Sequence, residues 1–526
     1  MRRRDVLKGV ALGAASLALP KVVIARPASV LRYMPGADLA VLDPLASSAF
    51  VTCYHANLAF DTLFGQDTKF NPHPQMVDGY VVENDGKLWR LVLRDGLKFH
   101  DGEPVLARDC VASIKRWGQA DAFGQALMAV TNELTAASDK EIVFRLSRPF
   151  PLLPAALGKS STYVPVIMPE RQALQSRSQL ISDPVGSGPY RYIHSERVPG
   201  QLTVYEKFAD YQPRADGVSD FTSGPKIAHI DRLEWRWIPD HSTAASALQA
   251  NEIDWWEAPL VDLLPLLEAD PNIVIDTIGE LGDMGIVRFN HLQPPFDRPE
   301  MRRAFAKMVS QTEMMQAMAG RTWDDNVGFF TPESPMASME GLPIAQSEPN
   351  FAEIKASLAA VGYKGEKITV LDPPSSHRIH TLTSMLVDQM KRAGLNVDVV
   401  ALDYANWAQR RTNRDTPENG GWNLVATLLP GQELWDPAGH IALRGNGGDA
   451  WPGWPTSPGL ESLRDEWLQS PDEAARADIC RRMQLQAIQD LPYVPAGRWT
   501  TPTAYRKGLT GVSRHIPIFY NLKIER

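Results

Sequence analysis

The clearest hydrophobic pattern in the chain is WRLVLR at residues 89–94, in which every second residue is Trp or Leu. A period of two residues is typical of a strand with one face in a core. Asp-Gly at 95–96 indicates a turn, 97–99 can return as a second strand, and Asp-Gly at 101–102 indicates another turn. Asp109 then stands where it can cap the start of a helix. The segment therefore predicts a short hairpin followed by a helix.

Helical and strand-like patterns alternate in the second half of the chain. Helical periodicity covers 297–320, 351–362, 381–394 and 461–489, and strand-like runs cover 285–290, 367–371, 395–400 and 422–429. In the first of these helices Asp297 suits the N-cap and Pro299 suits the first turn. The same helix has a Met-rich face, which we interpret as core because thioethers fill irregular gaps well. The alternation indicates an α/β lobe.

The length of 526 residues exceeds what one hydrophobic core usually supports, so two or more lobes are expected. The hydrophobic content of 44% and the charged content of 22% are typical of a globular protein. The 37 Gly and 41 Pro indicate many turns and long connections. Two connections, expected as loops near 270–283 and 492–505, are candidate crossings between the lobes.

The N-terminus has the form of an export signal. Arg3 and Arg4 make a twin-arginine pair, and the apolar run at 9–20 is too short to span a bilayer core of ~30 Å. Small residues before position 26 suit cleavage after Ala25. We therefore expect residues 1–25 to be a twin-arginine signal peptide and the mature protein to be periplasmic.

Net charge and cysteine content argue against several partners and cofactors. The formal net charge is −8, and residues 1–25 hold five basic residues and one acidic residue, so the mature chain is more negative still. An acidic surface disfavours nucleic acid and anionic lipid as partners. Cys53, Cys110 and Cys480 have no metal-binding spacing, although one pair could form a disulfide, and Cys110 is expected to be buried. We predict no metal and no cofactor.

Residues 184–190 read Pro-Val-Gly-Ser-Gly-Pro-Tyr, a Gly-rich turn rather than a catalytic motif. A nucleophile elbow requires Gly-x-Ser-x-Gly, whereas here the glycines flank Ser187 directly. The chain also has no GxxxxGK[ST] loop and no HExxH motif. A secreted enzyme is an alternative that no catalytic constellation supports, so we predict that the protein is not an enzyme.

The segment 89–109 closely resembles the signature of the bacterial extracellular solute-binding proteins of family 5, which serve peptide and nickel importers. The matching residues are Trp89, Leu93, Arg94, Gly96, Phe99, His100, Asp101, Gly102 and Asp109. The turn at 186–190 is similar to the family's Gly-Thr-Gly-Pro-Tyr, with Ser187 at the Thr position. The resemblance covers nearly the whole mature chain.

This resemblance implies a two-lobe α/β clamshell, the periplasmic-binding-protein fold, with an extra subdomain in lobe I. Lobe I would comprise 26–280 and 492–526, with the extra subdomain at about 45–180, and lobe II would comprise 281–491. The implied function is capture of a small solute, either peptide-like or another amine-bearing molecule, in the cleft between the lobes. A monomeric protein would then deliver the solute to the permease of an ABC importer in the inner membrane.

Glu433 is the strongest candidate for contact with the solute. The family's peptide-binding members carry Gly-Asp a few residues before an Asp-Pro, and that Asp holds the amino group of the ligand. Counting back from Asp436-Pro437 places Glu433 at this position, although the chain departs from the pattern in having Gln432-Glu433. A solvated loop carboxylate is the alternative. Arg378 is a second candidate, but it follows the strand at 367–371 later than the family's carboxylate-binding Arg does.

Aromatic residues complete the candidate set for ligand binding. They are Trp255 and Trp256 at a strand end, Trp407 in a loop-like context, Trp435 beside Glu433, and Tyr54 in a segment similar to the family's first helix. Ordinary core packing is an equally good interpretation of the Trp residues. Binding of a nickel or other metal chelate through His377, His380 or His440 is an alternative function, although the 11 His show no clustered spacing.

Overall fold

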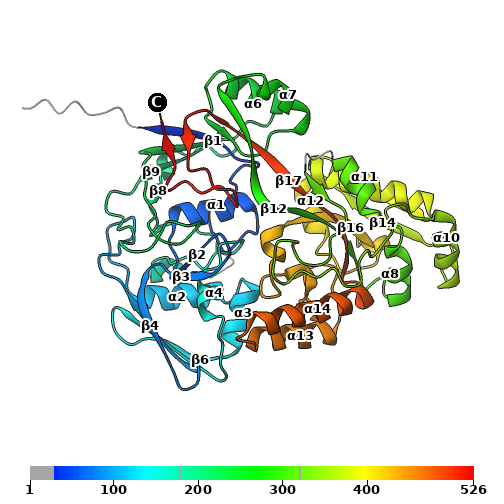
Figure 1. Cartoon of the computed structure of the whole chain (residues 1–526), viewed down its shortest axis with the longest axis horizontal. Helices are drawn as coiled ribbons and strands as arrows, with labels where there is room; N and C mark the ends of the chain where they lie inside the picture. Colours follow the sequence, from blue (N-terminus) through cyan, green and yellow to red (C-terminus); the bar gives the residue numbers. More distant parts are fainter. Residues whose placement is uncertain (1–28, 177–178, 319–321, 526) are drawn as a thin grey trace, which may run out of the picture.

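The computed structural model describes residues 29–525, apart from 177–178 and 319–321. The predicted signal peptide at 1–25 lies outside the described residues. The chain forms two α/β lobes side by side, as predicted (Figure 1). Lobe I holds the first described strand and lobe II holds the long helices of the second half of the chain. Among the described helices, none is long and apolar enough to cross a membrane.

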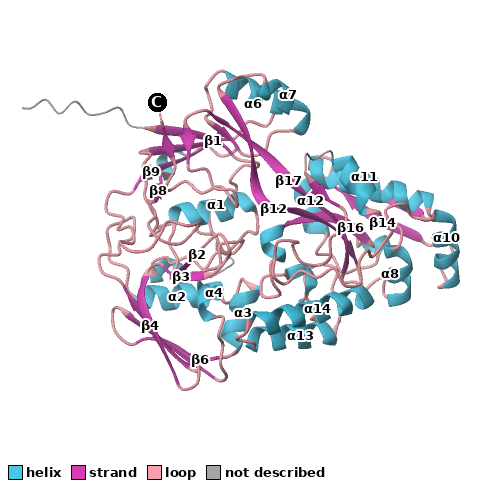
Figure 2. Cartoon of the chain, viewed as in Figure 1, coloured by secondary structure: helices cyan, strands magenta, loops and turns pink. Residues whose placement is uncertain are grey.

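One eleven-stranded sheet runs through both lobes, so they share a hydrogen-bonded framework (Figure 2). Its order is β15 (Asn396–Ala401), β14 (Lys367–Asp372), β16 (Leu424–Pro430), β12 (Ile273–Phe289), β17 (Tyr493–Arg506), β11 (Trp255–Trp256), β1 (Val30–Met34), β10 (Arg232–Arg236), β9 (Leu202–Lys207) and β8 (Tyr190–Tyr192), with β13 (Trp323–Asp324) beside β17. The first three strands belong to lobe II and the last five of the main order to lobe I. Their positions confirm the strands predicted in the second half of the chain.

The two crossings between the lobes are the long strands β12 and β17, which pair antiparallel with each other. Residues 273–278 pair with 501–506 in lobe I, and 283–288 pair with 493–499 in lobe II. The expectation of loops here is wrong, because each crossing satisfies its backbone groups by pairing with the other. The ladder is interrupted between Ile278 and Asp283, where Gly279 and Gly282 have φ of +71° and +67°.

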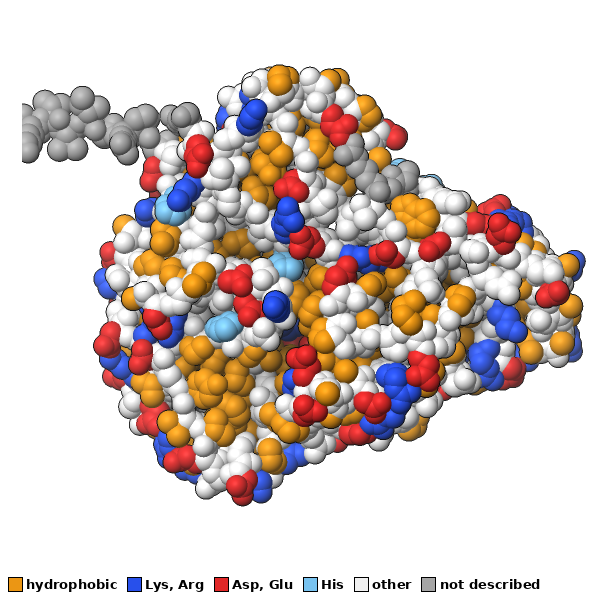
Figure 3. All heavy atoms as spheres, in the orientation of Figure 1, with side chains coloured by type: hydrophobic (Ala, Val, Ile, Leu, Met, Phe, Trp, Pro, Cys, Tyr) orange, Lys and Arg blue, Asp and Glu red, His pale blue; other side chains and the backbone are white. Residues whose placement is uncertain are grey.

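Lobe I carries a second sheet of four strands. Its order is β4 (Val77–Glu83), β5 (Leu88–Leu93), β7 (Glu141–Leu146) and β6 (Thr131–Ala136), and α2 (Ala107–Trp117) contacts β6 and β7. The predicted alternation in β5 is confirmed, since Trp89, Leu91 and Leu93 are all buried. On the molecular surface, hydrophobic side chains gather around β4, where Tyr80 and Val81 are exposed (Figure 3).

Two details of this region differ from the prediction. Residues 97–99 form no hairpin with β5, because β5 pairs with β4 and β7 and Lys98 makes only an isolated bridge to Pro104. Asp109 is not the N-cap, because α2 begins at Ala107 after Leu106. The Asp109 carboxylate instead reaches back from inside the first turn and accepts a hydrogen bond from the Leu106 N–H at 2.9 Å.

Two of the helices predicted in lobe II are each divided into two shorter ones. The helices that correspond to the predictions are α8 (Pro299–Ala306), α9 (Gln311–Met318), α10 (Phe351–Ala360), α11 (His377–Arg392), α13 (Pro458–Gln469) and α14 (Glu473–Asp490). The predicted helix at 297–320 is therefore two helices, as is the one at 461–489. Arg298 rather than Asp297 precedes α8, and Ser310 starts α9 by accepting the Glu313 N–H at 3.3 Å. The Met residues of the predicted helix at 297–320, namely 301, 308, 314 and 315, are buried core side chains, as predicted.

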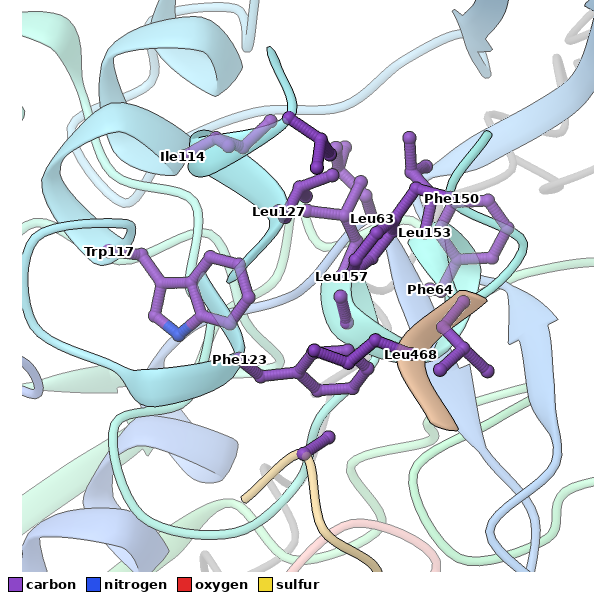
Figure 4. Packing of buried hydrophobic residues seen from close by; sticks show 14 of the residues in the cluster. Leu63, Phe64, Ile114, Trp117, Phe123, Leu127, Phe150, Leu153, Leu157 and Leu468 are labelled. Atoms are coloured by element: carbon purple, nitrogen blue, oxygen red, sulfur yellow. The ribbon is translucent and has the colours of Figure 1, made fainter. Parts of the chain in front are cut away.

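A hydrophobic cluster joins the two lobes. Figure 4 shows Trp117, Phe123 and Leu127 of lobe I in the same cluster as Leu468, which lies on α13 of lobe II. All four side chains are buried, so this part of the lobe boundary excludes water. Cys53, Cys110 and Cys480 are also buried, and each is a free thiol.

Candidate functional site at the lobe boundary

Strands of both lobes end at the boundary between them. In lobe I the parallel strands β1 and β11 end at Met34 and Trp256, and in lobe II the parallel strands β14 and β16 end at Asp372 and Pro430. Ligands of α/β sheets bind outside the carboxyl ends of the strands. Acidic and basic side chains lie along this boundary on the face shown in Figure 3. The residues that follow the four strand ends are therefore the candidates for contact with a ligand.

Glu257 follows β11 and is held by three donors of lobe I. The hydroxyls of Tyr33 and Tyr54 donate to its carboxylate at 2.6 and 3.0 Å, and the Gly36 N–H donates at 2.7 Å. Tyr54 lies on α1 (Phe50–Ala59) and is buried. Burial raises the pKa of Glu257, while these hydrogen bonds and the charge of Arg378 act in the opposite direction. The positive charge of Arg378, in lobe II, therefore acts on a carboxyl group of lobe I at this point.

Asp283 and Arg378 form an ion pair within lobe II. Asp283 is the first residue of β12 beyond the interrupted ladder, and its carboxylate lies 2.5 Å from Nη1 of Arg378 at the start of α11. Burial raises the pKa of Asp283, and the guanidinium of Arg378 opposes that shift. The Arg378 side chain is 41% exposed, so it keeps donors free for another group.

Glu433 lies in η4 (Gly431–Leu434), a 3₁₀ turn directly after β16, and is only 4% exposed. Its Oε1 accepts hydrogen bonds from the N–H of Thr162 at 2.8 Å and from Oγ1 of Thr162 at 2.5 Å. Thr162 belongs to lobe I, so this contact crosses the boundary. The alternative of a solvated loop carboxylate is wrong. Within the described part of the chain, no donor hydrogen-bonds Oε2 of Glu433.

Lys159 places a positive charge close to Glu433. Its ammonium lies 2.7 Å from the Asp121 carboxylate and also donates to the Thr162 carbonyl. Burial alone would lower the pKa of Lys159, but the charges of Asp121 and Glu433 raise it above its ordinary value. The lysine therefore stays protonated and offsets part of the buried negative charge.

Trp435 follows η4 and contacts lobe I directly. The centroid of its ring lies 4.7 Å from that of Phe70, and Phe70 in turn lies 5.4 Å from His515. Aromatic pairs at these separations contribute to packing beyond their buried area. Trp435 is half-buried, so one part of its ring stays accessible at the boundary.

The other three tryptophans of the candidate set lie in the hydrophobic interior. Trp255 and Trp256 end β11 as predicted and are fully buried; the indole N–H of Trp255 donates to Oγ1 of Thr503 at 2.8 Å. Trp407 lies on the helix α12 (Tyr404–Arg410) rather than in a loop, and it is 1% exposed. The helix forms because Asp403 caps it by accepting the Asn406 N–H at 3.0 Å.

The candidate histidines do not converge. His380 bonds to Asp372 at 2.9 Å, whereas the buried His440 lies 2.8 Å from the Phe329 carbonyl and 3.0 Å from the Tyr493 hydroxyl. Burial lowers the pKa of His440 to about 4. Among the described residues, no group of three or more His, Cys, Asp or Glu side chains could hold a metal ion.

Sequence reasoning missed several residues of the boundary. Glu257 completes the predicted strand end at Trp255–Trp256, but nothing in the sequence assigned it a contact. Asp283 could have been found from the Gly-x-x-Gly that precedes it. Thr162 gives no signal in the sequence, because it meets Glu433 only through the fold.

Known proteins resemble the chain along almost its whole length. The model of the bacterial extracellular solute-binding proteins, family 5 Middle, matches residues 71–439. A probable peptide ABC transporter periplasmic-binding protein of Sinorhizobium fredii is 33% identical over 99% of this chain and 99% of its own length. The glutathione-binding protein of Escherichia coli K12 is 24% identical over 95% of each chain.

Solved structures share the fold. The periplasmic binding protein AgaA of A. tumefaciens R10, in complex with agropinic acid, has a TM-score of 0.79 at 19% identity and covers 94% of this chain and 99% of its own. The periplasmic binding protein DppA of Helicobacter pylori, in complex with the peptide STSA, has the same TM-score and identity over 94% of this chain and 98% of its own. The predicted two-lobe clamshell is thus confirmed.

Proposed function

Because the chain belongs to the bacterial extracellular solute-binding proteins of family 5, we propose that it captures a small solute between its lobes for an ABC importer. The observation that carries this proposal is that charged groups of both lobes lie at the lobe boundary. Glu257 directly follows β11 of lobe I, and the charge of Arg378, near the start of α11 in lobe II, acts on it. Glu433 directly follows β16 of lobe II and bonds to Thr162 of lobe I. A solute that bridges them would stabilise the closed state over the open one.

The lobes would be divided as the resemblance implies. Lobe I would comprise 26–280 and 492–526, with an extra subdomain at about 45–180, and lobe II would comprise 281–491. The break in the ladder between Ile278 and Asp283 supports this division, since rotation between the lobes needs a point where strand pairing is interrupted. Catalysis is not part of the proposed role.

The solute would be a peptide or another molecule with an amino group. Glu433 is the proposed partner of that ammonium, through its Oε2, and Arg378 is the proposed partner of a carboxylate. Trp435 and Tyr54 would border the solute, while Trp255, Trp256 and Trp407 would support the strand ends from the interior. The names of the Sinorhizobium and Escherichia relatives, which mention a peptide and glutathione, agree with an amine-bearing solute.

The protein would act as a periplasmic monomer, exported by the twin-arginine route, and its partner would be the permease of the importer in the inner membrane. The pair Arg3-Arg4 supports this route. The relative from Sinorhizobium is described as periplasmic, which supports the same compartment.

The test is a comparison of Glu433→Gln with the unmodified protein. Native mass spectrometry of protein from the periplasm identifies amine-bearing solutes, and a dipeptide library supplies further ones; the best binder is then titrated by calorimetry. Loss of a charge-assisted hydrogen bond of ~1.5–3 kcal/mol should weaken binding by roughly ten- to a hundredfold.

Glu313→Gln is the matched control. Glu313 lies on α9, and its bonding partners Gln389 and Arg392 both belong to lobe II, so the variant should bind as the unmodified protein does. Equal dissociation constants for Glu433→Gln and the unmodified protein would contradict the role of Glu433 in binding the ammonium. Failure of every peptide and amine to bind would contradict the proposed solute class.

A further inference from the structure

A buried set of hydrogen bonds runs directly between residues of the two lobes. We call residues 159–162 of lobe I and 432–433 of lobe II the interlobe latch. In addition to the two hydrogen bonds from Thr162 to Glu433, Nε2 of Gln432 donates to Oγ of Ser160 at 2.6 Å. Ser160, Thr162 and Glu433 are all buried, so water does not compete for these groups in this conformation.

The lobe I half of the latch is fixed by its surroundings. The Ser160 carbonyl accepts from Nδ2 of Asn57 at 3.2 Å, and the Ser160 hydroxyl donates to Oε1 of Gln66 at 2.6 Å. The Lys159 ammonium is fixed by Asp121 at 2.7 Å. These partners lie in lobe I, so Thr162 is held in place before the lobes meet.

The lobe II half is equally fixed. Oγ1 of Thr331 donates to the Gly431 carbonyl at 2.5 Å, the Thr331 N–H donates to the Leu434 carbonyl at 3.1 Å, and the Ser334 hydroxyl donates to the Trp435 carbonyl at 2.5 Å. Gly431 also packs tightly, because a Cβ at this position would lie 2.3 Å from the Leu281 carbonyl. Two rigid, complementary halves lose little conformational entropy on meeting.

Further contacts close the boundary on either side of the latch. Trp435 packs on Phe70, and Leu468 of α13 shares a buried cluster with Phe123 of lobe I. An exposed ion pair between Arg148 and Asp465, at 2.6 Å, lies at the rim. The hydrogen bonds to Glu433 stabilise the closed form, because they offset the cost of removing its carboxylate from water.

We propose that the interlobe latch closes the two lobes in the absence of solute, so that Thr162 serves as an internal partner of Glu433. The solute then enters a population that is already biased toward the closed form. Each latch bond raises the closed fraction, and apparent affinity rises with the fraction of binding-competent molecules. This inference concerns the solute-free protein and stands whether or not the solute carries an ammonium.

The experiment measures the distance between the lobes in solute-free protein. Val218→Cys in lobe I and Met339→Cys in lobe II supply exposed sites for nitroxide labels, at 83% and 64% exposure, while the three native thiols are buried. Unfolding and refolding removes co-purified solute. Double electron–electron resonance then gives the distance distribution of the unmodified latch and of Thr162→Val, Thr162→Ser, Glu433→Gln and Glu313→Gln.

The expected result is one narrow closed distance for the unmodified protein and for Glu313→Gln, whose substituted residue is bonded within lobe II. Thr162→Val keeps the shape but loses the hydroxyl donor, and Glu433→Gln loses the charge. Each should lower the closed-to-open ratio by about tenfold and add a longer distance, while Thr162→Ser restores the closed one.

Two results would overturn the proposal. One is an open, solute-free distance in the unmodified protein. The other is a closed distance that both Thr162→Val and Glu433→Gln leave unchanged. Circular dichroism checks that each variant is folded, and Thr162→Val alone decides the matter if Glu433→Gln does not fold. Because no solute is added, failure here is distinguishable from failure of the calorimetric test of solute binding.

Discussion

Substitution of Gly282 by Ala tests whether the interrupted ladder between the lobes is a strained turn that only glycine accommodates. Gly282 has φ of +67°, and a Cβ there would lie 2.6 Å from the Trp499 carbonyl and 3.0 Å from Nε of Arg498. Gly279 has a similar φ of +71°, but its nearest neighbour would be the His515 carbonyl at 3.6 Å, an ordinary contact. The two positions therefore differ in space and not in backbone conformation.

The expected magnitudes follow from this difference. The left-handed conformation costs a non-glycine residue roughly 1–2 kcal/mol, and this cost applies to both substitutions. At position 282 the methyl group must also displace the β17 backbone, which adds about 1–3 kcal/mol. Arg498 increases the cost, because its Nε donates to the Leu281 carbonyl at 2.7 Å and would have to move.

Urea unfolding followed by circular dichroism measures both variants. Gly279→Ala should lower the free energy of unfolding by about 1–2 kcal/mol and Gly282→Ala by about 2–5 kcal/mol. The distance between nitroxide labels at residues 218 and 339 should change in Gly282→Ala and stay the same in Gly279→Ala. Equal losses in the two variants, with an unchanged distance between the labels, would refute the idea that close packing at Gly282 makes this turn accept only glycine.

Two further predictions concern pH and export. Burial raises the pKa of Glu257 and Asp283, so their contribution to stability is fully present below the unfolded pKa of about 4 and is lost as pH rises through the folded value. Urea unfolding of solute-free protein between pH 4 and 8 should show this decline in the free energy of unfolding, and the double variant Glu257→Gln with Asp283→Asn should flatten it. An equally steep decline in the double variant would contradict the attribution to these two carboxyl groups. Arg3→Lys with Arg4→Lys should stop export and leave folding intact, and cell fractionation that finds the double variant in the periplasm would show that the general secretory route suffices.

Local patterns predicted local structure well. The alternation at 89–94 became β5 with its Trp and Leu residues buried, and the strands of lobe II lie where the pattern placed them. Failures occurred where a small feature divides a longer pattern. Ser310 separates α8 from α9, although the Met residues on both sides keep the helical period. Asp403 is a suitable N-cap in the sequence and indicates the helix α12, which contains Trp407, where a loop was predicted.

The crossings and the site depend on contacts between distant residues. β12 and β17 pair across more than 200 positions of the chain, so nothing near Ile273 or Tyr493 shows that each has a partner. Glu433 was singled out by a family pattern, and the structure places it at the lobe boundary. Its bond to Thr162 could not be foreseen, because the two residues are separated by 271 positions and belong to different lobes.

The strand β17 also determines when the protein can fold during synthesis. Its first half pairs with the lobe II part of β12, and its second half pairs with β11 and the lobe I part of β12. Both lobes therefore lack a central strand until residues 493–506 have left the ribosome. Until then β11 and β12 expose unpaired backbone edges to other chains. Such long-range pairing slows folding, and the unpaired edges stay open to association with other chains until β17 is in place.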